Sequence, residues 1–189
     1  MATNEGLISV SAVTEQLTKQ FQALLMMLRE AIELCPDNLW DRESDTNRSW
    51  QIAYHALYFT HCYAQPSFEQ FAEWGGQHQP SQNDDGIGGQ PDPKSALPFL
   101  PDPYSKAEIL EYWQFCWDNI ADWLAAGDVA SSESGFSWYE VPKLEHLLVN
   151  LRHTSLHTGQ LMERVRANCD LGVRWRGTWP PKNPTPPTA

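Results

Sequence analysis

The chain has 189 residues and a mass of 21.5 kDa, enough for one domain with a sizeable core. Apolar residues make up 41% of it and aromatic residues 12%, a composition that excludes wholesale disorder. Its 24 acidic residues outnumber 13 basic ones, and the net charge of −11 repels both a phosphate backbone and an anionic membrane surface. We therefore expect neither nucleic acid nor a membrane as a partner.

The first residues and the cysteines bear on cellular location. The segment 1–16 lacks a basic region followed by an apolar core, and no window approaches the ~18 uninterrupted apolar residues of a membrane span. We therefore predict a cytoplasmic protein. The cysteines lack the paired spacing of a zinc knuckle or a redox couple, and we interpret them as reduced core residues. They are Cys35, Cys62, Cys116 and Cys169.

Two helices are predicted in the first third of the chain. Apolar residues recur at helical spacing until Pro36 and predict an amphipathic helix over 9–35. A second helix is predicted over 49–65, with Ser49 as its N-cap. Because this second helix is apolar nearly all round, we expect it to be buried.

Two further helices follow a long gap. The third, over 105–127, opens with a capping box formed by Ser105 and Glu108, and the fourth covers 143–168. Four long helices without a strand pattern predict an all-α fold, a four-helix bundle. We assign residues 1–171 to this single domain and residues 172–189 to an extended, proline-rich tail.

The connection between the second and third helices, 66–104, is rich in glycine and proline. About ten extended residues suffice to run back along a ~30 Å bundle, so this connection is long enough for a crossover that makes the two helices parallel. Loops of such length often line binding sites, and this one carries Trp74, Phe99 and Tyr104. We expect it to form part of the wall of a substrate cleft.

A histidine pair on the fourth helix is the strongest chemical signal. His153 and His157 lie four residues apart, so both imidazoles leave the same side of the helix about 6 Å apart and can chelate one metal ion. A third ligand can come from the second helix, which offers His55 and His61. If these two helices are antiparallel, His55 and His157 lie at depths that agree within about two turns.

An alternative interpretation assigns no metal to this pair. The polar side of the fourth helix, which carries His146, His153 and His157, can equally be a solvated face opposite a leucine stripe. Other site types are excluded, because no Glu is followed three residues later by His as in di-iron bundles. The chain also lacks the zincin, nucleophile-elbow and phosphate-loop motifs.

The runs IAYHALYFTHCYA and NLRHTSLHTGQL, in this order and on these helices, resemble the DinB-like (YfiT-like) superfamily of metal-dependent four-helix bundles. The resemblance covers about 9–168 and implies an up-down-down-up bundle. It also implies that His55, His153 and His157 bind a divalent metal. Nickel and zinc are the leading candidates because imidazole suits both, with iron and manganese as further options.

The resemblance implies a transferase that uses a low-molecular-weight thiol, such as bacillithiol or mycothiol, on a small-molecule substrate. Two alternatives stay open: a metal-dependent hydrolase, and a noncatalytic module for metal binding or dimerisation. We also expect a homodimer, because the second helix has little polar surface of its own.

Three further residues are candidates for contacts around the metal ligands. His146 lies two turns before His153 and is either a substrate-contacting or ligand-supporting group or a surface histidine. Asn150 and Gln160 each lie about one turn from a ligand. Their amides can orient the imidazoles by hydrogen bonds.

Overall fold

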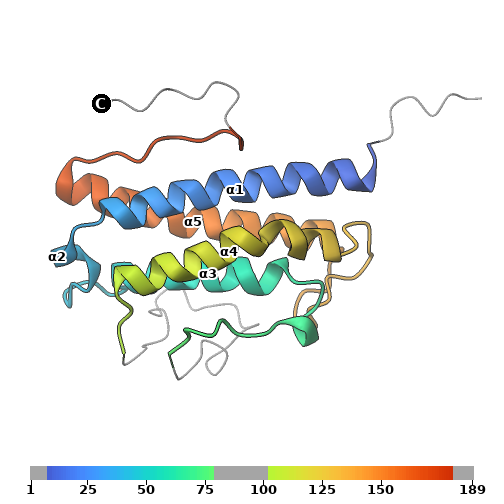
Figure 1. Cartoon of the computed structure of the whole chain (residues 1–189), viewed down its shortest axis with the longest axis horizontal. Coiled ribbons are helices and arrows are strands. Elements are labelled where there is room, and N and C mark those ends of the chain that lie inside the picture. Colours follow the sequence, from blue (N-terminus) through green and yellow to red (C-terminus); the bar gives the residue numbers. More distant parts are fainter. Residues whose placement is uncertain (1–7, 79–101, 181–189) are drawn as a thin grey trace, which may run out of the picture.

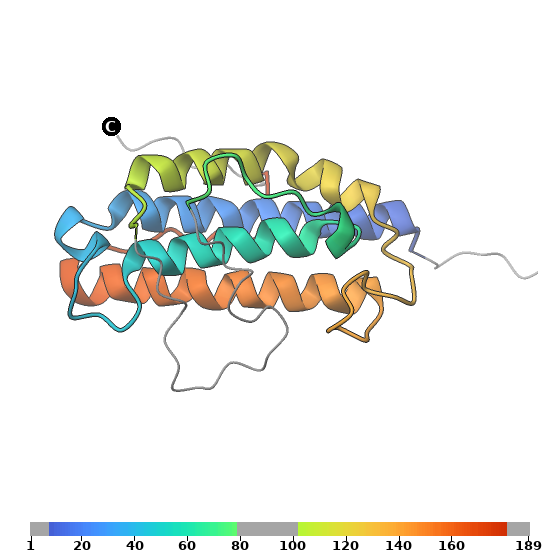
Figure 2. The ribbon, with the colours of Figure 1, turned by 90° about the horizontal axis from the view of Figure 1, so that it is seen from below.

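The computed structural model describes residues 8–78 and 102–180, and every regular element in these ranges is helical (Figures 1 and 2). The predicted all-α class is therefore confirmed. The elements, which also include a 3-10 turn, are α1 (Val10–Leu34), α2 (Asp37–Trp40), α3 (Ser49–Ala64), the turn Phe68–Gln70, α4 (Lys106–Ala126) and α5 (Lys143–Cys169).

Two helix starts follow directly from local sequence. The Ser9 hydroxyl accepts a hydrogen bond of 3.2 Å from the backbone N–H of Ala12 at the start of α1. At the start of α4, the Glu108 N–H donates to Ser105 Oγ at 3.2 Å, and the Ser105 N–H donates to Glu108 Oε2 at 2.8 Å. The capping box predicted for this helix is therefore confirmed.

The predicted N-cap of α3 is wrong. Ser49 is the first helical residue, and its hydroxyl donates 2.7 Å to the carbonyl of Leu39 in α2. Arg48 occupies the N-cap position, and its backbone N–H donates to Gln51 Oε1 at 2.7 Å. Helix α2 is a single turn, too short to show a periodic pattern in the sequence, and it was not predicted. The hydroxyl of Ser49 bonds a carbonyl of this turn and therefore does not cap α3.

Helix α3 packs against both α4 and α5, and α1 packs against the same two helices. Contacts along the α3 and α5 pair run in opposite senses: Ser49 near the start of α3 bonds Arg164 late in α5, and the last turn of α3 meets Lys143 at the start of α5. These two helices are therefore antiparallel. Figure 2 shows both lying side by side along their length.

Contacts between α3 and α4 run in the same sense. The ring centroids of Tyr54 and Tyr112 are 5.7 Å apart, and those of His61 and Trp123, farther along both helices, are 4.5 Å apart. The two helices thus point the same way, as the colour gradient in Figure 1 also shows.

Helix α3 is the most enclosed element of the described chain. Between Ser49 and Ala64 only His55 and Phe59 are not buried. The neighbours that bury it are α2, α4 and α5 of the same chain together with the segments beside them, so its apolar surface gives no reason to require a second copy. None of the described helices combines the length and the hydropathy needed to cross a membrane.

Buried Lys143 forms hydrogen bonds both with the residues that follow α3 and with the connection before α5. Its ammonium donates to the carbonyl oxygens of Gln65 at 2.6 Å, Pro66 at 3.1 Å and Ser134 at 2.9 Å. Burial lowers the pKa of Lys143 to about 8. The adjacent Gly135 has φ of +84°, a conformation that L side chains rarely adopt. The three hydrogen bonds of Lys143 therefore position the first residue of α5 against the end of α3.

The described part of the predicted tail lies against the helices. Gln20 of α1 donates to the Gly177 carbonyl at 3.2 Å, and the Trp179 ring packs edge-on against Trp117 of α4 at 5.3 Å. Trp175, by contrast, is 78% exposed. The tail is therefore held by the Trp179 ring, by backbone contacts and by the ion pair of Arg176 with Glu30 of α1 at 3.3 Å.

Candidate metal centre

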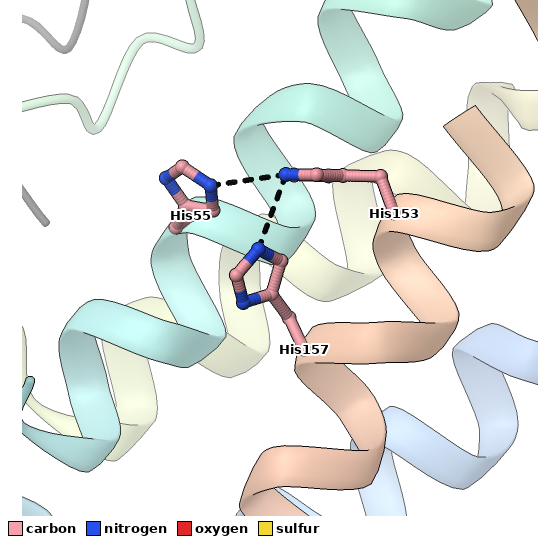
Figure 3. A group of neighbouring side chains, drawn as sticks. All are labelled: His55, His153 and His157. Carbon is pink, nitrogen blue, oxygen red and sulfur yellow. Dashed lines mark hydrogen bonds between the residues drawn. The ribbon is translucent and has the colours of Figure 1, made fainter. Parts of the chain in front are cut away.

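Three histidines from two helices converge on one point. α3 supplies His55, and α5 supplies His153 and His157. The Nε2 atom of His153 lies 3.1 Å from Nε2 of His55 and 3.1 Å from Nε2 of His157 (Figure 3). One ligand atom from each ring lies within 4.8 Å of the others, so the group can hold a metal ion.

The spacing of the three nitrogens suits a divalent ion. Metal–nitrogen bonds of ~2.0–2.1 Å in tetrahedral geometry place ligand nitrogens about 3.3 Å apart. The two separations from His153, 3.1 Å each, are close to this value, and the ligand atoms of all three rings lie within 4.8 Å of one another, so the rings need to shift only modestly to hold an ion. Without an ion, one neutral imidazole nitrogen carries a single hydrogen and cannot form two good hydrogen bonds at once. A metal satisfies all three lone pairs together.

Gln160 determines which nitrogen of His157 faces the centre. Its side-chain oxygen lies 2.9 Å from Nδ1 of His157. Because an amide oxygen can only accept, Nδ1 carries the hydrogen, and Nε2 keeps its lone pair directed at the other two rings. This arrangement matches the role expected for Gln160 from the sequence.

Burial keeps the two candidate ligands on α5, His153 and His157, neutral. Burial, with a smaller contribution from the neighbouring His157, lowers the pKa of His153 to about 3. Burial also lowers the pKa of His157, against the opposing effect of its bond to Gln160. Nδ1 of His153 is buried and has no hydrogen-bond partner among the described residues. Neutral imidazoles are the form that binds metals.

The centre is only partly buried. His55 and His153 are half-buried, and His157 is 8% exposed. Three imidazoles occupy three positions of a divalent ion and leave further positions for water or a ligand. This arrangement is typical of catalytic metal sites rather than of structural ones.

Of the two histidines on α3, His55 and not His61 lies beside the histidine pair of α5. The other candidate, His61, is buried on the side of α3 that faces α4. Its Nδ1 lies 3.1 Å from the hydroxyl oxygen of Tyr112, and its ring stacks on Trp123 at 4.5 Å. His61 is therefore a core residue and lies outside the histidine group.

Of the remaining candidates, neither His146 nor Asn150 lies at the surface. His146 is fully buried among the rings of Tyr63, Phe136 and Tyr139 at 4.6 to 4.9 Å, and neither of its nitrogens has a hydrogen-bond partner among the described residues. The Asn150 amide donates 3.3 Å to the carbonyl of Thr60. Asn150 thus ties α5 to α3 instead of orienting an imidazole.

The interpretation of a solvated histidine face on α5 is wrong. His146, Asn150 and His157 are buried against α3, whereas Leu148 and Leu156 are 50% and 58% exposed. The reason is that α3 presents polar groups to this side of α5. Thr60 and Thr154, which the sequence analysis did not single out, form a buried hydroxyl pair at 2.7 Å. No periodicity in either sequence indicates that pair.

Comparisons of the chain with protein-family models, curated proteins and solved structures find no match. The description of the centre therefore rests on the chain's own residues.

Proposed function

We propose that the protein is a DinB-like, metal-dependent transferase that uses a low-molecular-weight thiol. The observation that carries the proposal is the convergence of His55, His153 and His157: Nε2 of His153 lies 3.1 Å from Nε2 of each of the other two, and one nitrogen from each ring lies within 4.8 Å of the others. The half-buried positions of His55 and His153 favour a reachable centre over a sealed one. Zinc and nickel fit a site of three imidazoles.

Each residue of the centre has a defined task. His55 positions a nitrogen from α3, and the pair on α5 supplies the other two. Gln160 fixes the tautomer of His157. A bound divalent ion supplies Lewis acidity that holds a thiol as its reactive thiolate at neutral pH. The neutral imidazoles leave the positive charge of the ion available for that thiolate.

The proposal includes the architecture of this superfamily, an up-down-down-up bundle. The antiparallel packing of α3 on α5 and the parallel packing of α3 on α4 support it. The crossover that it requires falls largely on residues 79–101, outside the described residues, as does Phe99 of the expected cleft wall. Trp74 and Tyr104, at the described ends of this segment, stack on Tyr112 and Tyr54.

Metal binding is tested first. The chain is stripped with a chelator, dialysed against zinc or nickel, and analysed for bound metal. We expect one equivalent in the wild type and none in the double variant His153→Ala, His157→Ala. His78→Ala is the matched control, since His78 contacts Glu108 and Tyr104 away from the centre. Equal metal content in the double variant and the wild type contradicts the proposal, provided that circular dichroism shows both to be helical.

The reaction class is tested with the loaded protein. Cysteine, glutathione, bacillithiol and mycothiol are each supplied with an epoxide, and loss of the epoxide is followed with and without metal. We expect consumption that needs both a thiol and the intact histidines. Hydrolysis of an ester such as phenyl acetate without any thiol, abolished by the double variant, would instead establish the hydrolase alternative.

A further inference from the structure

Phe59 stands out because a nearly buried helix brings it to the surface beside the centre. Of the 16 residues of α3, only His55 and Phe59 are not buried, and they lie one turn apart. The accessible surface of this helix thus consists of one candidate metal ligand and one phenyl ring.

The ring contacts candidate ligands from both helices. Its centroid lies 4.7 Å from that of His55, tilted by 60°, and 5.1 Å from that of His153, with the rings nearly perpendicular at 74°. On α5, Leu156 lies between the two histidines in sequence and is 58% exposed. The described contacts of the half-buried histidines therefore include one large apolar side chain, the ring of Phe59.

We infer that Phe59 is a specificity-determining residue that favours substrates with an aromatic group next to the atom that binds the metal. The inference rests on the proposed function, because it needs an ion with open positions. A flat apolar group on the bound molecule can pack against the phenyl ring and displace water from it. A small or charged group at the same place gains no such contact and leaves the ring hydrated.

The test uses two hydroxamates, which bind divalent metals through the same two oxygens and differ only in the group attached. The protein is loaded with cobalt(II), whose visible spectrum reports a change in its ligands. Dissociation constants are measured for benzohydroxamate and acetohydroxamate. We expect benzohydroxamate to bind the wild type about tenfold more tightly, in keeping with an aromatic contact plus burial.

Substitutions of Phe59 distinguish a role in ligand preference from a role in the stability of the fold. Phe59→Ala should reduce the preference to about twofold or less, and Phe59→Tyr should retain it. Phe59→Leu, which keeps most of the apolar volume, should give an intermediate preference and covers the case in which the alanine variant does not fold. Phe115→Ala is the matched control, because the half-buried Phe115 packs perpendicular to His61 at the same 5.1 Å, away from the centre.

The hydroxamate measurements test the role of Phe59 separately from the proposed metal-dependent function. An equal preference in the wild type, Phe59→Ala and Phe59→Leu shows that the ring only supports the fold and overturns the inference alone. A cobalt spectrum that neither hydroxamate changes contradicts the open metal positions and overturns both. Loss of the preference in Phe115→Ala as well contradicts a local role for Phe59.

Discussion

Two core histidines are buried in the neutral form, and we predict that the protein loses stability in mild acid for this reason. His146 is fully buried, and His61 is 2% exposed. Burial lowers the pKa of each from 6.5 to about 3, and nearby Lys143 adds to the effect at His146. Protonation of either imidazole therefore favours the unfolded chain, in which the ring is exposed to water.

The size of the effect follows from proton binding in the two states. Below pH ~6.5 the unfolded chain binds protons at both histidines and the folded chain does not, so the free energy of unfolding falls as the pH falls toward the folded-state pKa of about 3. At pH ~5 each histidine is about 1.5 pH units below its unfolded pKa, a loss of about 2 kcal/mol each. His61 and His146 together account for about 4 kcal/mol.

The assay is urea unfolding of the metal-free protein, followed by circular dichroism at pH ~7 and ~5. His146→Leu should lose about 2 kcal/mol less than the wild type between these two pH values, because the titration of His146 is gone whereas those of His61, His153 and His157 remain. It should also be more stable at neutral pH, since two buried nitrogens without partners are removed. His78→Ala is the control at a partly exposed histidine. An equal loss in the wild type and His146→Leu would refute the reasoning.

Three other substitutions test contacts described above. Gln160→Leu should weaken metal affinity about tenfold in competition with a chelator, because His157 loses the acceptor that fixes its tautomer, whereas Gln160→Glu should retain it. Lys143→Met should lower the free energy of unfolding by about 3 kcal/mol in urea, since three carbonyls lose their donor. Gly135→Ala should lower the melting temperature, because a Cβ would lie 2.2 Å from the Pro66 oxygen; an unchanged value would contradict this.

Features set by neighbouring residues were predictable from the sequence. Pro36 ends α1 because it cannot continue the helix, and the Ser105 and Glu108 pair starts α4 because its bonds are made within one turn. The histidine pair on α5 is of the same kind, since four-residue spacing alone brings two imidazoles together. Helical spacing left His55 and His61 both open, because the nearly uniform apolar sequence of α3 does not reveal which side faces α5, and only the family resemblance pointed to His55.

The polar side of α5 shows where such reasoning fails. A helical wheel separates polar from apolar residues, and the usual expectation places the polar side in water. Here that side faces α3, where Thr60 meets Thr154 and Asn150 donates to the Thr60 carbonyl. Leu148 and Leu156 are exposed, whereas Leu147, Leu161 and Val165 of the same helix are buried. Only the partner helix decides which face is buried, and its identity is not a local property.

This seam between α3 and α5 is costly in stability. An apolar interface of equal size would bury no unsatisfied groups, whereas both nitrogens of His146 and Nδ1 of His153 have no partners among the described residues. A bound metal ion would bond the converging nitrogens of His55, His153 and His157. It would leave the two nitrogens of His146 without a partner. Polar groups kept at such a cost are typical of functional regions. A stabilising His146→Leu substitution would therefore show that the chain retains this histidine for a reason other than folding.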